Sequence, residues 1–156
     1  MRFTTLFDLY GLPGDFPQMA QHSHLSDTSL RAELLEAAMA EAVQDRRLIP
    51  YLQRHEFESL VLAGLDKLEE LLDTAGDLQG VAELRASVGN ARPEDVDDGP
   101  ESAPSKRIMR HVPSYQKVLH GPLVVDAVGL PVLRRACPRF DRWVSRLEDL
   151  AGEGRP

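Results

Sequence analysis

Near its start the sequence predicts a strand, a helix and a second strand in succession, and this order restricts the possible folds. The aromatic and β-branched stretch "RFTTLF", 2–7, runs into turn signals, which predicts a strand. Over 26–45, leucine and alanine recur at four-residue spacing behind a Ser-Asp capping pair, which predicts an amphipathic helix. "RLIPYLQ", 47–53, predicts a second strand, and Pro50 favours an edge position for it. This order implies parallel pairing.

Helical patterns dominate the rest of the chain. Apolar residues recur at helical spacing over 66–74, 78–88 and 138–150, and glycines follow the first two segments. The sequence therefore predicts the α/β class, with a small parallel sheet flanked by several helices and a helix-rich C-terminal half.

A single domain is expected over 1–150. An acidic loop rich in proline and glycine interrupts it at 90–105, and a disordered tail follows at 151–156. A sheet of only two strands is marginal by itself. We therefore expect that one or more N-terminal strands are missing from this chain.

Composition also bears on where in the cell the protein is expected. No apolar run approaches the roughly 18 residues that a membrane span needs, and no secretory signal is visible, so a cytoplasmic location is expected. The single cysteine, Cys137, lacks the spacing of a zinc site, which favours buried packing.

Charge is distributed unevenly along the chain. Residues 1–101 carry 8 Lys and Arg against 20 Asp and Glu, whereas residues 102–156 carry 10 against 5. The acidic total argues against indiscriminate nucleic-acid binding, but the basic C-terminal part leaves room for a local phosphate-facing surface.

Acidic side chains follow both predicted strands. Asp8 stands where the first strand ends, and Glu56 and Glu58 follow the second in "HEFE" beside His55. Carboxylates are the ligands that Mg²⁺ prefers. The alternatives are a turn cap for Asp8, first-turn acids for the glutamates and a structural hydrogen bond for His55. The glutamates share a face in an extended segment but point about 200° apart in a helix.

Two groups of polar residues are candidates for phosphate contacts. Ser105 is expected to be the N-cap of a helix that starts at Lys106, whose N–H groups, with Lys106 and Arg107, would bind phosphate; a solvated cap is the alternative. Lys117 and His120 precede an expected Gly-Pro turn. They predict a catalytic lysine or a phosphate clamp, and a turn with a packed histidine is the alternative.

Arginines recur at helical spacing near the C-terminus. Arg135, Arg139, Arg142 and Arg146 follow one another at spacings of four, three and four. They predict a basic stripe for nucleic acid or an acidic partner, and solvated surface is the alternative.

Five stretches together resemble a known bacterial family, the one designated domain of unknown function 4276, over residues 3–148. In chain order they are "TTLFDLYGLPGDFP", "RLIPYLQRHEFESLVLA", "DDGPESAPSKRI", "YQKVLHGPL" and "GLPVLRRACPRFDRWVSRLE". The resemblance implies a fold related to the TOPRIM domain, which would make the sheet a truncated TOPRIM-like one. It also implies an ABC- or AAA-type ATPase encoded nearby, in phage defence or a mobile element.

A TOPRIM-like site holds Mg²⁺ between acids at the carboxyl ends of parallel strands, where the ion stabilises charge on a phosphate. By resemblance, the metal ligands are Asp8, Glu56 and Glu58, and the catalytic residues are Glu56, Lys106, Lys117 and His120. Two departures stand out: the upstream glutamate of such sites has no counterpart, and Tyr10 stands where a second acid of an Asp-x-Asp pair would be.

Three functions compete at this point. The first is a metal-dependent TOPRIM-like nuclease component of an ATPase-associated defence or mobile-element system, with nucleic acid as its partner. The second is a non-catalytic partner or regulator of the ATPase. The third is a truncated product that works only with its missing N-terminal segment. A homo-oligomer fits any of them.

Overall fold

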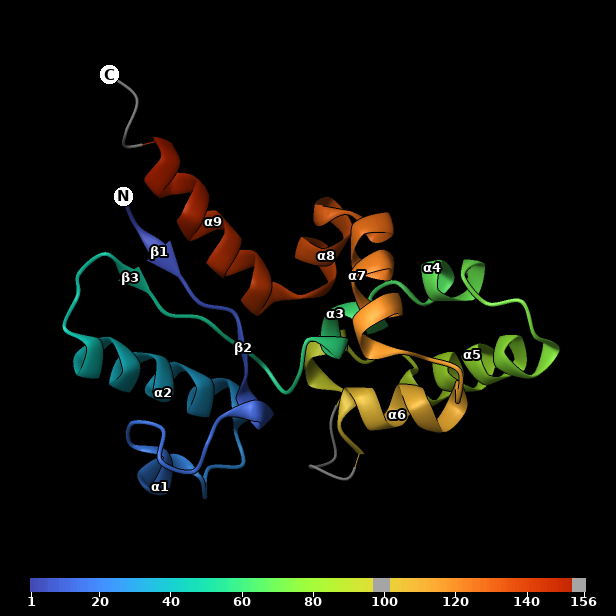
Figure 1. Ribbon diagram of the computed structural model, residues 1–156, viewed down its shortest axis with the longest axis horizontal. Helices are drawn as coiled ribbons and strands as arrows, with labels where there is room; N and C mark the ends of the chain where they lie inside the picture. The colour runs from blue at the N-terminus through green and yellow to red at the C-terminus, as the bar shows by residue number, and fades with distance from the viewer. Residues whose placement is uncertain (97–101, 153–156) are drawn as a thin grey trace. The chain divides into compact units, whose positions relative to one another are not determined.

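The computed structural model describes residues 1–96 and 102–152, and the chain divides into two compact units, Met1–Glu56 and Phe57–Pro156 (Figure 1). The N-terminal unit holds the strands, and the C-terminal unit is helical in its described part. The α/β class, the parallel pairing and the helix-rich C-terminal half are thus confirmed. Folding of the two units as one domain over 1–150 stays a prediction.

Four short strands pair in parallel in the N-terminal unit. They are β1 (Phe3–Thr4), β2 (Phe7–Asp8), β3 (Leu48–Ile49) and β4 (Leu52–Gln53). β1 pairs with β3 in the register Phe3↔Leu48, and β2 pairs with β4 in the register Asp8↔Gln53. Each predicted strand therefore appears as two short ones.

A threonine side chain splits the strands. The backbone N–H of Thr5 donates to the Ile49 carbonyl at 3.4 Å, and that of Phe7 donates to the Tyr51 carbonyl at 3.3 Å. Between them the Thr5 hydroxyl accepts from the Tyr51 N–H at 2.9 Å and donates to the Tyr51 carbonyl at 3.1 Å. A side chain thus replaces one backbone bond of the ladder, and the parallel course continues past it.

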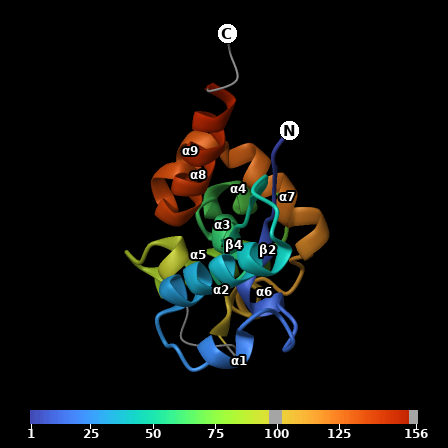
Figure 2. The same cartoon turned by 90° about the vertical axis from the view of Figure 1, so that its left-hand side faces the viewer.

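Helix α2 (Thr28–Val43) lies along the strands, as Figures 1 and 2 show. Its first turn is capped by Asp27, which accepts from two backbone N–H groups at 3.0 Å. The Glu36 carboxylate of α2 accepts from the Leu52 N–H of β4 at 2.7 Å. This bond joins the helix to the outer side of the strand pair.

The buried stripe of α2 differs from the predicted one. In the predicted four-residue repeat of leucine and alanine, Leu30 is 43% exposed whereas Ala38 is buried, and Ala32 and Leu35 complete the buried side. Ala32 and Leu35 pack with Leu52 in the core of this unit. Before α2 come the 3-10 turn η1 (Leu9–Gly11) and the short helix α1 (Met19–His22).

The described part of the C-terminal unit consists of helices and one 3-10 turn. They are α3 (Glu58–Leu62), α4 (Leu65–Glu70), α5 (Ala75–Val88), η2 (Pro93–Asp95), α6 (Pro104–His111), α7 (Lys117–Val128), α8 (Leu130–Ala136) and α9 (Pro138–Gly152). Helices α8 and α9 pack against each other (Figures 1 and 2).

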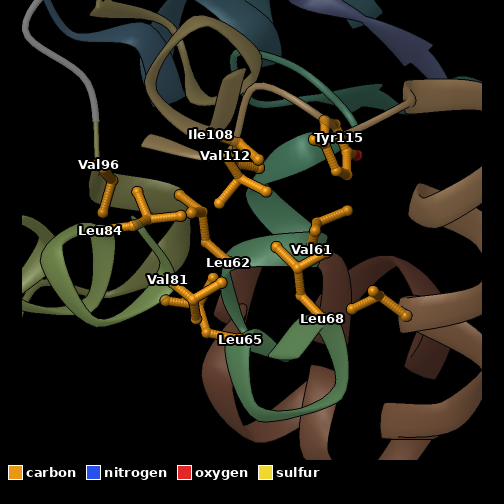
Figure 3. Close-up of a cluster of buried hydrophobic side chains, with 11 residues drawn as sticks. Val61, Leu62, Leu65, Leu68, Val81, Leu84, Val96, Ile108, Val112 and Tyr115 are labelled. Carbon is orange, nitrogen blue, oxygen red and sulfur yellow. The ribbon is translucent and has the colours of Figure 1, made fainter. Parts of the chain in front are cut away.

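The core of this unit gathers side chains from helices far apart in the sequence (Figure 3). Val61 and Leu68 come from α3 and α4, Leu84 comes from α5, and Ile108 comes from α6. Gly80 lets α5 and α6 meet, because a Cβ there would lie 1.9 Å from the backbone oxygen of His111. The contact between the two helices therefore depends on the missing side chain.

Helix boundaries differ from the predicted ones where caps and packing decide them. Helix α4 ends at Glu70 instead of 74, and α5 begins at Ala75 instead of 78, because the Thr74 hydroxyl accepts from the Asp77 N–H at 3.1 Å. The predicted loop over 90–105 is broken by η2 and by the start of α6 at Pro104. Residues 97–101 of that loop, and 153–156 of the predicted tail, lie outside the described residues.

The expected Gly-Pro turn was wrong. Gly121 and Pro122 lie inside α7. Gly121 is buried, and a Cβ there would come within 3.2 Å of the Tyr115 hydroxyl and 3.3 Å of the Phe57 ring. Close packing, rather than a turn, explains this glycine.

Candidate functional site

Asp8 lies at the carboxyl end of β2, as predicted, beside the end of the parallel strand β4. Its register partner is Gln53, which is fully buried and accepts from the Tyr51 hydroxyl at 2.9 Å. In open α/β sheets ligands bind outside the carboxyl ends of the strands. Here one carboxylate and one amide stand at that edge.

His55 follows the end of β4 in a left-handed turn. Its φ is 64°, it is 1% exposed, and its carbonyl accepts from the Tyr10 N–H at 3.0 Å. Its ring nitrogen Nδ1 lies 3.2 Å from the Tyr10 hydroxyl, and the two rings are 5.3 Å apart. The Arg31 guanidinium lies 5.8 Å from the centre of the Tyr10 ring. Tyr10, which replaces the expected second acid, thus holds the histidine in place.

The "HEFE" segment is neither extended nor helical throughout. The strand ends at Gln53, His55 turns the chain, and the helix α3 begins only at Glu58. Glu56 is half-buried and is the last residue of the N-terminal unit, whereas Glu58 is the first helical residue of the C-terminal unit. The two glutamates therefore belong to different units of the chain.

The Glu58 carboxylate is paired with a lysine. Its side chain is 5% exposed, and its Oε1 atom lies 3.8 Å from the Nζ atom of Lys117, the first residue of α7. Glu58 also lies in the first turn of α3, where a negative charge favours the helix dipole. The lysine and the N-terminal end of α3 thus both place positive charge beside the Glu58 carboxylate.

A complete magnesium site is not supplied by the described residues. Within 1–96 and 102–152, no group of three or more His, Cys, Asp or Glu side chains could hold a metal ion. The register partner of Asp8 is an amide, and Glu58 has a cation beside it. Magnesium binding by Asp8, Glu56 and Glu58 stays a prediction, since these acids are divided between the two units.

Helix α6 carries the predicted phosphate-binding residues, but its cap differs from the prediction. The N-cap position belongs to Ala103, Pro104 is the first helical residue, and Ser105 lies buried in the first turn. A proline suits the first helical position because its missing N–H would have no partner there. Ser105 as the N-cap was therefore wrong.

The cations of α6 lie on one side of the helix. Lys106 and Arg110 are exposed, Arg107 is half-buried, and Ile108 is fully buried on the opposite side. At 100° per residue the three cations fall within an arc of about 100°. The α6 basic face, as we name Lys106, Arg107 and Arg110, presents three positive charges along little more than one turn.

His120 caps the start of α7. Its Nδ1 atom accepts from the backbone N–H of Gln116 at 2.9 Å, and its ring lies 5.8 Å from that of Tyr115. Lys117 lies at the same helix end, with its side chain 44% exposed. The structure therefore brings the predicted pair Lys117 and His120 to one helix terminus, with Glu58 beside the lysine.

Sequence reasoning missed a carboxylate next to this terminus. Asp77 is 8% exposed, and hydrogen bonds from Thr74 and then Ser114 hold the pKa of its carboxyl below the usual value, with His120 acting in the same direction. The Thr-x-x-Asp spacing of 74–77 is a capping pattern that could have revealed it.

A second missed carboxylate caps α9. The Glu94 side chain is almost fully buried and accepts from the backbone N–H groups of Arg139 at 2.8 Å and Phe140 at 2.9 Å. Cys137 is buried, as predicted, and burial together with the Glu94 charge raises the pKa of its thiol to about 12. No sequence signal joins residues 45 positions apart.

The predicted arginine stripe is interrupted. Arg139 is buried, whereas Arg135, Arg142 and Arg146 are exposed, and the end of α8 falls between the first two of the four. Arg134 instead joins α8 to α9 through ion pairs with Asp141 and Glu148. The C-terminal helices therefore present no continuous four-residue basic stripe.

The last observations concern membrane spans and the comparisons with known proteins. No helix in the described part of the chain is both long enough and apolar enough to cross a membrane. Neither curated proteins nor solved structures gave a match to the chain. The sequence model of the family described as domain of unknown function (DUF4276) matches residues 1–148, so the chain belongs to that family.

Proposed function

We propose that this chain is the nucleic-acid-binding component of an ATPase-associated, TOPRIM-like nuclease system. The observation that carries the proposal is the α6 basic face, in which the exposed Lys106 and Arg110 flank the half-buried Arg107 within an arc of about 100°. Phosphate contacts from Lys and Arg supply most of the sequence-independent affinity for nucleic acid. The family resemblance supports the nuclease and the ATPase partner.

The exposed cations of the α6 basic face are Lys106 and Arg110. Ile108 and Val112 are fully buried and fix one side of α6 in the core, which leaves the basic side facing away from it. Arg110 has neither a hydrogen bond nor an ion pair within the described residues, so its five donors remain available to phosphate oxygens.

For this chain we propose nucleic-acid binding, and cleavage is assigned to the ATPase-associated nuclease system as a whole. Within the described residues no group of three or more His, Cys, Asp or Glu side chains could hold a metal ion, so metal-dependent cleavage is proposed only for the assembled system. Asp8 at the carboxyl end of β2 is the residue that we expect to matter for cleavage in that assembly.

Fluorescence anisotropy with labelled DNA and RNA tests the proposal. We expect Lys106→Ala/Arg110→Ala to weaken binding uniformly across sequences, by about tenfold or more at low salt. The double variant Arg46→Ala/Arg92→Ala removes the same charge from two exposed arginines elsewhere and should bind as the wild type does. Equal affinities of the two double variants would contradict the proposal.

A second candidate is favoured by the Glu58–Lys117 pair. The burial of Glu58 and the 3.8 Å separation from Lys117 support a structural use of two residues that a nuclease would use for chemistry. In that case the chain is a non-catalytic partner or regulator of the ATPase. It would co-purify with the ATPase encoded nearby, and the α6 variants would show no change in nucleic-acid affinity.

A further inference from the structure

The outer side of α7 is an apolar surface on a helix that is already apolar on its inner side. Val118 is 92% exposed, Leu119 51% and Leu123 46%, and Pro122 is exposed between them. These four residues, which we name the α7 face, lie within an arc of about 140°. Gly121 and Val124 on the other side are buried.

An exposed apolar surface of this kind is expected to be covered by a binding partner. Single exposed apolar residues are ordinary, but a contiguous patch marks an interaction site, and a helix that is apolar all round is normally buried all round. Only one charged residue, Asp126, shares the arc of the α7 face.

We propose that the α7 face is the interface of a homodimer, in which α7 packs antiparallel against α7 of a second copy. Val118 precedes Pro122 by four residues, and Asp126 follows it by four. A two-fold axis at Pro122 therefore sets Asp126 of each copy against Val118 of the other.

The charges of the helix complement each other in this arrangement. Val118 lies in the first turn of α7, which holds no acidic residue and presents the positive end of the helix dipole. The Asp126 side chain has no hydrogen bond or ion pair within the described residues. In the dimer each Asp126 meets the N-terminal turn of the other α7, so the interface is electrostatically self-complementary as well as apolar.

This interface goes beyond the proposed function, since it uses none of the cations of the α6 basic face. Sedimentation velocity of the full chain over a wide concentration range measures it. We expect a dimer whose dissociation constant rises by about tenfold or more in Leu119→Asp/Leu123→Asp. The control Leu71→Asp/Leu78→Asp changes two leucines that are 42% and 36% exposed elsewhere and should leave the dimer intact.

Cross-linking tests the axis and does not depend on destabilising the face. A Pro122→Cys variant places two thiols at the two-fold axis, and we expect an oxidant to link it into a dimer faster than a Leu78→Cys control. Cys137 is buried and does not compete. Circular dichroism confirms that each variant is folded. A wild type that stays monomeric, a dimer unaffected by the face variant, or cross-linking no faster than in the control would overturn the proposal.

Discussion

The buried carboxylate of Glu94 accepts a hydrogen bond from the backbone N–H of Phe140 at 2.9 Å, across 46 residues of sequence. A second bond from the N–H of Arg139, at 2.8 Å, completes the cap of α9. This carboxylate joins η2, near the start of the acidic loop, to the last helix of the chain. Charged acceptors at a helix N-terminus form strong hydrogen bonds and favour the helix dipole.

Replacing Glu94 should therefore destabilise the C-terminal unit. Glu94→Gln keeps the shape but removes the charge and one acceptor, and we expect a loss of about 1–3 kcal/mol in the free energy of unfolding. Urea denaturation followed by circular dichroism measures it. The control Glu70→Gln breaks an exposed ion pair with Lys67 and should cost at most about 1 kcal/mol. Equal losses in the two variants would contradict the capping role.

The thiol of Cys137 should be inert in the folded protein. With its pKa raised to about 12 by burial and Glu94, almost none of it is thiolate at pH 8. A thiol reagent should modify it only after denaturation. Because the folded pKa lies above the ordinary value of 9.0, the unfolded chain loses its proton first, so this residue lowers stability as the pH rises above about 9. Rapid labelling of Cys137 in the native protein at pH 8 would contradict the predicted inertness of the thiol.

Two glycines of α5 should respond in opposite ways to alanine. A Cβ at Gly80 would lie 1.9 Å from the His111 carbonyl oxygen, so Gly80→Ala should destabilise the protein by about 1–3 kcal/mol or more. Gly76 has nothing within 4 Å, and Gly76→Ala should stabilise the helix by about 0.5 kcal/mol. Thermal unfolding of both variants checks the sign of each effect.

Asp77 should contribute to acid sensitivity. Hydrogen bonds from Thr74 and Ser114 hold its pKa below the usual 3.8. The ionised carboxylate therefore stabilises the folded protein fully above that pH, and this contribution is lost as the pH falls below it. We expect Asp77→Asn to lower the urea midpoint at pH 7 and to narrow the difference from the wild type under acid conditions. A difference independent of pH would show that the charge is not involved.

Local sequence signals predicted the parts of the fold that depend on local physics. The strand–helix–strand order predicted parallel pairing, and Asp27 predicted the start of α2. Packing between distant segments left no such signal. Gly121 reads as a turn in the sequence but is required by Tyr115 and Phe57, which lie close to it only in the folded unit.

The same contrast between local signals and distant packing applies to the candidate site. The position of Asp8 at a strand end followed from the hydrophobic pattern, and its neighbour Gln53 followed only from the register. The sequence left open the conformation of "HEFE", because a left-handed histidine between strand and helix is decided by its bonds to Tyr10. The predicted N-cap at Ser105 was wrong by two positions, because the helix begins at Pro104 and its N-cap is Ala103.

The salt dependence of nucleic-acid affinity measures how many phosphates the α6 basic face contacts. Each phosphate that a protein neutralises on double-stranded DNA contributes about −0.9 to the slope of log affinity against log salt concentration. If the α6 basic face makes these contacts, Lys106→Ala/Arg110→Ala should reduce the slope by about 2 relative to the wild type. The Arg46→Ala/Arg92→Ala control should leave the slope unchanged. A wild-type slope that survives the loss of Lys106 and Arg110 would contradict the account.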